Sequence, residues 1–151
     1  LLGSGQKEIE DALVDLARNK PYKGRICVLR GFSPILANKI YAAGDFFLIP
    51  SLYEPCGLTD FIAQLFGNLP VVHHTGGLVK VIDEETGFTF DEHTGDALAE
   101  TMEKAIHVYR SSQQTMAQMQ KKAIRLIHSK YTWEKVMDCY LKLYEKALGS
   151  L

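Results

Sequence analysis

Along this chain, short runs of apolar residues alternate with segments in which apolar residues recur at helical spacing. The runs predict strands and the spaced segments predict helices. Three short apolar runs have the length of buried strands: 25–30, 45–50 and 69–72. Segments with apolar residues at helical spacing precede or follow these runs: 9–17, 35–41 and 58–66. Because single helices separate the strands, right-handed crossovers and a parallel sheet are favoured. We therefore predict an α/β fold, a Rossmann-like parallel sheet flanked by helices.

The last third of the chain has only helical periodicity. Apolar residues mark one helix face in each of three segments: 98–109, 116–127 and 133–144. We expect these faces to pack against the sheet or against each other. Before them, residues 85–90 predict a turn and a short edge strand. No repeat, low-complexity tract or linker interrupts the pattern, so we predict one domain that ends in three helices.

Two segments that combine polar residues with glycine follow predicted strands. They are Ser51–Thr59 and His74–Leu78, and the first of them opens a predicted helix. In open α/β sheets, ligands bind at the carboxyl ends of the strands. Helix N-termini at that edge offer free N–H groups and a positive dipole end to phosphates. The sequence therefore predicts a site for a phosphorylated sugar or a nucleotide, with Glu54 beside it.

Glu54 precedes Pro55 and so lies on a rigid turn. A binding or catalytic carboxylate is one interpretation, and a surface acid that caps the following helix is the other. Cys56 has no His, Asn or Asp at a spacing typical of a catalytic partner, and we expect a small packed thiol there. The glycines of both segments fit two roles, tight turns or a close approach of backbone N–H groups to an anion.

The composition narrows the range of partners. With 46% apolar residues, 23% charged residues and a formal net charge of −1, the chain lacks the basic surplus that nucleic-acid binding requires. No apolar run approaches the roughly 20 residues of a membrane span. Three scattered cysteines without CxxC spacing favour a reducing compartment. The chain does not begin with Met, and we expect its natural N-terminus to lie upstream.

Two further patterns carry little weight. Gly3-Ser4-Gly5 has the start of a dinucleotide-binding loop but lacks the third glycine, so a tight strand-to-helix turn is the simpler interpretation. His73 and His74 are adjacent, and adjacent residues of a strand point to opposite faces. We therefore predict no metal site.

The segment Tyr41–Thr59, which contains Glu54-Pro55-Cys56-Gly57-Leu58, closely resembles the signature of bacterial glycogen synthases and plant starch synthases. Segments 67–72 and 75–78 fall at the spacing of this family, and 131–133 is similar to the start of its final helix. Its members transfer glucose from ADP-glucose, or from UDP-glucose in some members, to the non-reducing end of an α-1,4-glucan with retention. They have two Rossmann-like domains of the GT-B type, with the active site between them.

The resemblance implies that residues 1–151 form the C-terminal nucleotide-sugar-binding domain, incomplete at its N-terminal side and without the acceptor domain. Its partners would be a nucleotide sugar and, through the N-terminal domain, an α-glucan acceptor, with no nucleic acid, membrane, metal or cofactor. The expected location is the cytoplasm, or the plastid in a plant or alga. A non-catalytic or degenerate module that binds ADP or a dinucleotide on the same fold is the alternative.

The resemblance also assigns site residues. Glu54 would be the catalytic carboxylate and would contact the hydroxyls of the donor sugar. Phe32, which follows Gly31, matches the aromatic position that stacks on the nucleotide base. Six residues would bind the donor sugar and its phosphates: Cys56, Gly57, Leu58, Thr59, Thr75 and Gly76.

The chain departs from the family in three respects. His73 and His74 stand where members often carry Arg or Lys. Ile62 stands where related transferases place a second Glu, so only one carboxylate is expected in the site. The phosphate-binding Arg and Lys of the family lie upstream of residue 1.

Overall fold

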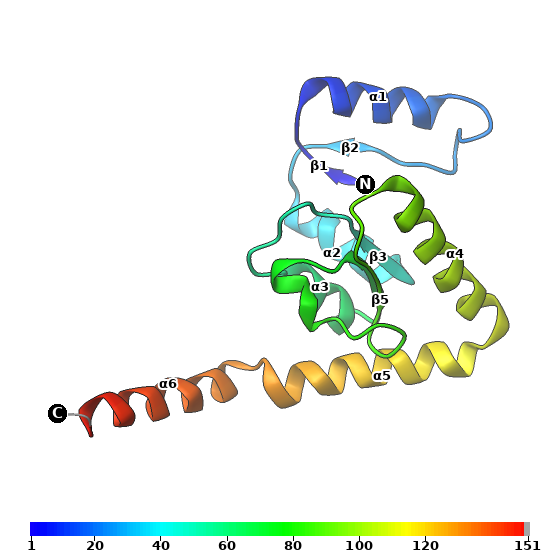
Figure 1. The fold of residues 1–151 in the computed structure, drawn as a ribbon. Helices are drawn as coiled ribbons and strands as arrows, with labels where there is room; N and C mark the ends of the chain where they lie inside the picture. Colours follow the sequence, from blue (N-terminus) through cyan, green and yellow to red (C-terminus); the bar gives the residue numbers. More distant parts are fainter. Residues whose placement is uncertain (150–151) are drawn as a thin grey trace. The chain divides into compact units, whose positions relative to one another are not determined.

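The computed structural model describes residues 1–149 of the 151-residue chain, and Figure 1 follows its elements in order. The chain divides into two compact units, residues 1–40 and 41–151. The division falls within α2 (Pro34–Ala43), where the sequence pattern shows no linker.

The first unit contains two parallel strands and the helix that connects them: β1 (Leu2–Gly3), α1 (Lys7–Arg18) and β2 (Leu29–Arg30). The strand predicted over 25–30 is therefore shorter than expected. Arg30 forms ion pairs with Glu10 and Asp11 of α1. The next helix, α2, begins after Ser33, whose Oγ accepts the N–H of Leu36 at 3.3 Å.

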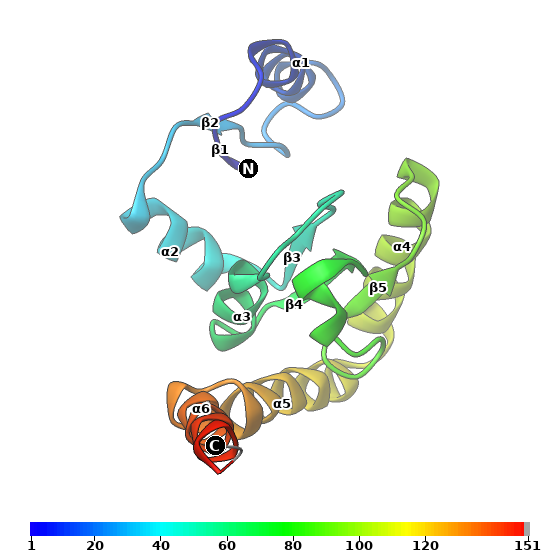
Figure 2. The same cartoon turned by 60° about the vertical axis from the view of Figure 1, so that its left-hand side comes forward.

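The second unit contains a sheet of three parallel strands in the order β3 (Phe46–Ile49), β4 (Leu69–His73) and β5 (Phe88–Phe90). The connection from β3 to β4 contains α3 (Leu58–Leu65), and that from β4 to β5 contains the short 3-10 helix η1 (Gly76–Lys80). Figure 2 shows α3 beside β3 and β4. The predicted α/β fold with a parallel sheet is confirmed.

Two helices cover one face of this sheet, α4 (Gly95–Ser111) and α5 (Gln113–Lys130), which meet at an angle in Figure 1. An apolar cluster fills the space between these helices and the sheet. Its buried side chains come from β4, β5, α4 and α5: Leu69, Val71, Phe88, Ala105, Met116 and Met119. A second cluster on the other face contains Ile49, Val72, Leu78 and Val81. Leu69 and Val71 of β4 belong to the first cluster and Val72 to the second, as the alternation of side chains along a strand requires.

The last helix, α6 (Trp133–Leu148), departs from expectation. The faces predicted on α4 and α5 pack as expected, but no residue of α6 is buried in the described part of the chain. Trp133 is 70% exposed, and the rings of Tyr140 and Tyr144 contact only each other among aromatic side chains of residues 1–149. The periodicity correctly predicted an amphipathic helix, but it does not specify what the apolar face packs against.

None of the helices within residues 1–149 is both long and apolar enough to cross a membrane.

Candidate functional site

Glu54 lies on the turn between β3 and α3, and its carboxylate is held from two sides. Its Oε1 accepts the backbone N–H of Gly57 at 3.0 Å, and its Oε2 accepts the Ser51 hydroxyl at 3.4 Å. Gly57 has a φ of 66°, which suits glycine, and directly precedes α3. The contact with Gly57 is what a helix-capping acid would make. The half-buried carboxylate nevertheless keeps acceptor capacity for a ligand, because an ionised Glu has about four lone-pair sites.

The segment His74–Leu78 packs against this turn through backbone atoms. The N–H of Gly77 donates to the carbonyl oxygen of Glu54 at 2.7 Å. A Cβ on Gly76 would lie 2.0 Å from the same oxygen, and a Cβ on Gly77 would lie 2.3 Å from the carbonyl carbon and oxygen of Cys56. The structure thus brings together the two segments that the sequence predicted at one edge of the sheet.

Lys80, at the end of η1, joins the two segments with its side chain. Its Nζ donates to the carbonyl oxygens of Cys56 at 2.6 Å and Gly57 at 2.8 Å. The same ammonium lies 3.2 Å from Oδ1 of Asp60 and 4.1 Å from the ring centroid of Phe61. Lys80 and Asp60 are not among the residues predicted from the sequence, because no motif spacing links two residues that meet only in the folded chain.

Asp60 is fully buried, and among residues 1–149 neither carboxylate oxygen meets a hydrogen-bond donor in good geometry. Burial raises the pKa of the Asp60 carboxyl from 3.8 to about 6, and the nearby Lys80 ammonium opposes part of that increase. The buried charge is therefore retained near neutral pH at a cost in stability.

This cost predicts a pH dependence. Between about pH 4 and pH 6 the folded state holds the Asp60 proton more strongly than the unfolded state, so stability contributed by this group falls as the pH rises. The difference between 3.8 and about 6 corresponds to about 3 kcal/mol. The melting temperature of Asp60→Asn, relative to the parent, should therefore increase from pH 4 to pH 7. Asp138→Asn, which changes an exposed carboxylate, is the control and should show no such trend.

His73 connects the ends of the strands at the same edge. Its Nδ1 lies 2.7 Å from the carbonyl oxygen of Ser51, and its Nε2 lies 3.1 Å from that of Asp91. The neighbouring His74 instead places Nδ1 3.5 Å from the Asp91 carboxylate. The two rings thus have different partners, and residues 1–149 contain no group of three His, Cys, Asp or Glu side chains placed to hold a metal.

The remaining predicted residues differ in exposure. Leu58 and Thr59 are exposed in the first turn of α3, and Thr75 precedes η1 in extended conformation. The Cys56 thiol is exposed, so the expectation of a packed thiol was wrong. Its backbone rather than its side chain is held, through the carbonyl bound to Lys80. Phe32 belongs to the first unit, where its ring is 87% exposed, so it is not a core residue of this chain.

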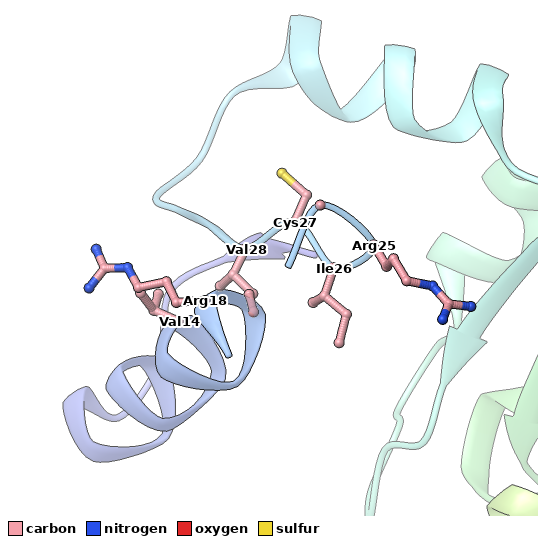
Figure 3. Close-up of a pocket in the computed structure, with 8 residues that line it drawn as sticks. Val14, Arg18, Arg25, Ile26, Cys27 and Val28 are labelled. Atoms are coloured by element: carbon pink, nitrogen blue, oxygen red, sulfur yellow. The ribbon is translucent and has the colours of Figure 1, made fainter. Parts of the chain in front are cut away.

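A pocket of about 490 Å³ lies in the first unit, between α1 and the segment that leads into β2. Arg18 and Arg25 are among its lining residues, but Figure 3 shows their guanidinium groups pointing in opposite directions. None of the sequence-predicted site residues lines it. Because its charged groups do not converge, this pocket has no features of an anion site.

The sequence model of the family described as "Glycosyl transferases group 1" matches residues 1–125. The chain belongs to this family. Among curated relatives, a glycogen synthase of Pseudomonas fluorescens is 39% identical to this chain over 150 residues. The match covers 99% of this chain and 30% of that protein. A glycogen synthase of Xanthomonas campestris is 35% identical over 99% of this chain and 31% of its own length. The chain thus spans about a third of the length of the curated relatives that it matches.

Solved structures agree with this assignment to the glycosyl transferases. The catalytic domain of starch synthase IV from Arabidopsis thaliana, bound to ADP and acarbose, superposes with a TM-score of 0.83. It is 26% identical, and the match covers 97% of this chain and 31% of that one. The predicted resemblance to glycogen and starch synthases and the predicted GT-B-like fold are confirmed. The chain is a glycosyltransferase domain.

Proposed function

We propose that this chain is the donor-binding domain of a glucan synthase that transfers glucose from ADP-glucose or UDP-glucose to the non-reducing end of an α-1,4-glucan, with retention. The observation that carries the proposal is the fixed Glu54 carboxylate beside the Gly76–Gly77 turn at the start of α3. This site lies in a chain that matches a glycogen synthase along 99% of its length. The ADP bound to the related starch synthase IV supports a nucleoside diphosphate as part of the donor.

The site chemistry suits the departure of a nucleoside diphosphate from glucose. The leaving group gains negative charge, and free N–H groups at the start of α3 stabilise such charge where it develops. The sugar gains oxocarbenium character, and a carboxylate such as Glu54 offsets positive charge on the ring and orients the hydroxyls. The main chain of residues 56–58, together with Thr59, Thr75 and Gly76, would surround the sugar and its phosphates.

The proposal is tested by transfer of labelled glucose to glycogen by the complete protein that carries this chain. ADP-glucose and UDP-glucose are compared as donors. The 151-residue chain alone is expected to transfer none, because its relatives are about three times longer and the family resemblance implies a second domain that binds the acceptor. A complete protein that binds ADP or NAD without transferring glucose would contradict the proposal and support a non-catalytic nucleotide-binding module.

Phe32→Ala in the complete protein should weaken binding of the donor nucleotide about fivefold or more, since stacking of a base on an aromatic ring contributes roughly 1–3 kcal/mol. The exposed ring of Phe32 is available for such stacking. Calorimetric titration with ADP and UDP measures the effect. Tyr22→Ala removes another partly exposed ring of the same unit and should leave the dissociation constant unchanged. An equal constant for Phe32→Ala and the parent would remove Phe32 from the site.

A further inference from the structure

Lys80 makes contacts that the proposed donor site does not yet explain. It lies at the end of η1, yet its side chain is only 11% exposed and reaches the turn that precedes α3. The ammonium has three N–H groups and three nearby acceptors: the carbonyl oxygens of Cys56 and Gly57 and the carboxylate of Asp60. The ammonium thus faces these three groups and is largely shielded from solvent, so we do not assign direct binding of the donor to this lysine.

The geometry of the peptide unit gives these contacts a consequence. In a trans peptide the C=O and the N–H of one unit point in opposite directions. The carbonyl of Cys56 shares its unit with the N–H of Gly57, and the carbonyl of Gly57 shares its unit with the N–H of Leu58. Because Lys80 holds both carbonyls, both N–H groups point away from it.

The two N–H groups have different uses. That of Gly57 donates to Oε1 of Glu54 and so fixes the carboxylate. That of Leu58, the first residue of α3, has no acceptor within the helix and is free for an anion. We infer that Lys80 is a positioning residue of the donor site, which holds the carbonyls of Cys56 and Gly57 and so directs two N–H groups toward Glu54 and the donor phosphates. This role rests on the proposed function of the site.

Two neighbours make the arrangement stable. Asp60 neutralises the buried ammonium, and the Phe61 ring faces it at 4.1 Å to the centroid. Gly57 leaves room for it, because a Cβ there would lie 2.8 Å from Nζ of Lys80. The contacts of Lys80 therefore do more than neutralise Asp60. They hold the end of η1 against the start of α3.

The complete protein is used for the test, with two variants and one control. Lys80→Met removes the charge and the donors at similar length, and the double variant Asp60→Asn/Lys80→Met also removes the buried carboxylate. Lys122→Met is the matched control, because it breaks an exposed ion pair with Glu85 away from the turn. We measure hydrogen exchange in peptides that span residues 52–60 and in β4. We also measure the melting temperature, the affinity for ADP and UDP, and kcat and KM for the donor.

We expect the double variant to keep the parent melting temperature while exchange at residues 56–58 accelerates and exchange in β4 does not. Its kcat/KM should fall about tenfold or more, mainly in kcat, since misplacing a preorganised group impairs the reaction geometry. The control should match the parent in every measurement.

Parent-like exchange and kinetics in the double variant would mean that Lys80 only neutralises Asp60, and would overturn the inference. A lower melting temperature with faster exchange in β4 as well would show a role in folding and would overturn it equally. If the parent transfers no glucose, the proposed function fails, while the exchange comparison still decides whether Lys80 orders the turn.

Discussion

Glu54→Gln is expected to lower the turnover of the complete enzyme about a hundredfold or more, the scale of losing one preorganised electrostatic group. The affinity for ADP and the melting temperature should hardly change. An interaction that strengthens only as the glycosidic bond breaks affects turnover rather than ground-state binding.

Glu54→Gln removes the charge of this side chain but keeps its hydrogen bond to the turn. A Gln side chain retains an oxygen that can accept the Gly57 N–H now bound to Oε1 of Glu54 at 3.0 Å. The turn should therefore keep its shape. If Glu54 serves only as a helix-capping acid, Glu54→Gln will retain most of its activity. Glu92→Gln, in an exposed loop of the same unit, is the control.

Gly77→Ala is expected to separate the two glycine-containing segments and to abolish measurable transfer. Its Cβ would lie 2.3 Å from the backbone of Cys56, and no flexible side chain is there to move aside. Such overpacking should lower the free energy of unfolding by about 3 kcal/mol. It should also move Glu54, because the N–H of Gly77 is bound to the carbonyl of Glu54.

Gly95→Ala provides the matched control for this substitution. A Cβ at Gly95 meets no atom within 4 Å, and the residue lies in the first turn of α4. Stability should then rise by about 0.4–1 kcal/mol, because alanine has less conformational freedom in the unfolded chain. Melting curves and donor turnover distinguish the two variants. A Gly77→Ala protein as stable and active as Gly95→Ala would show that the segments need not pack so closely.

The sheet and the meeting of the two segments at the candidate site could be predicted from the sequence because both depend on local patterns. Apolar runs located β3 and β4, and the rule that ligands bind at the carboxyl ends of parallel strands placed Glu54 and Gly76 at the same edge. The residue types of the turns indicated phosphate and sugar chemistry before any distance was known.

Contacts through space were not predictable in this way. Lys80 is 24 residues from Cys56, and a single lysine in a sequence gives no sign of the carbonyl that it will hold. The exposure of the Cys56 thiol was missed for the same reason, since the usual burial of cysteine is an average over many environments. For α6, periodicity gave the amphipathic helix but could not name a partner for its apolar face.

The close packing of the glycine-containing segments also determines how donor preference could be redesigned. A side chain on Gly76 or Gly77 would collide with the backbone of the neighbouring turn, so these two positions cannot accept any other residue without rebuilding it. Leu58 and Thr59 are exposed beside the same turn and can vary in size and polarity without disturbing it. At the proposed donor site, a library built for a different sugar should therefore diversify the side chains at the start of α3 and keep the glycines of η1 fixed.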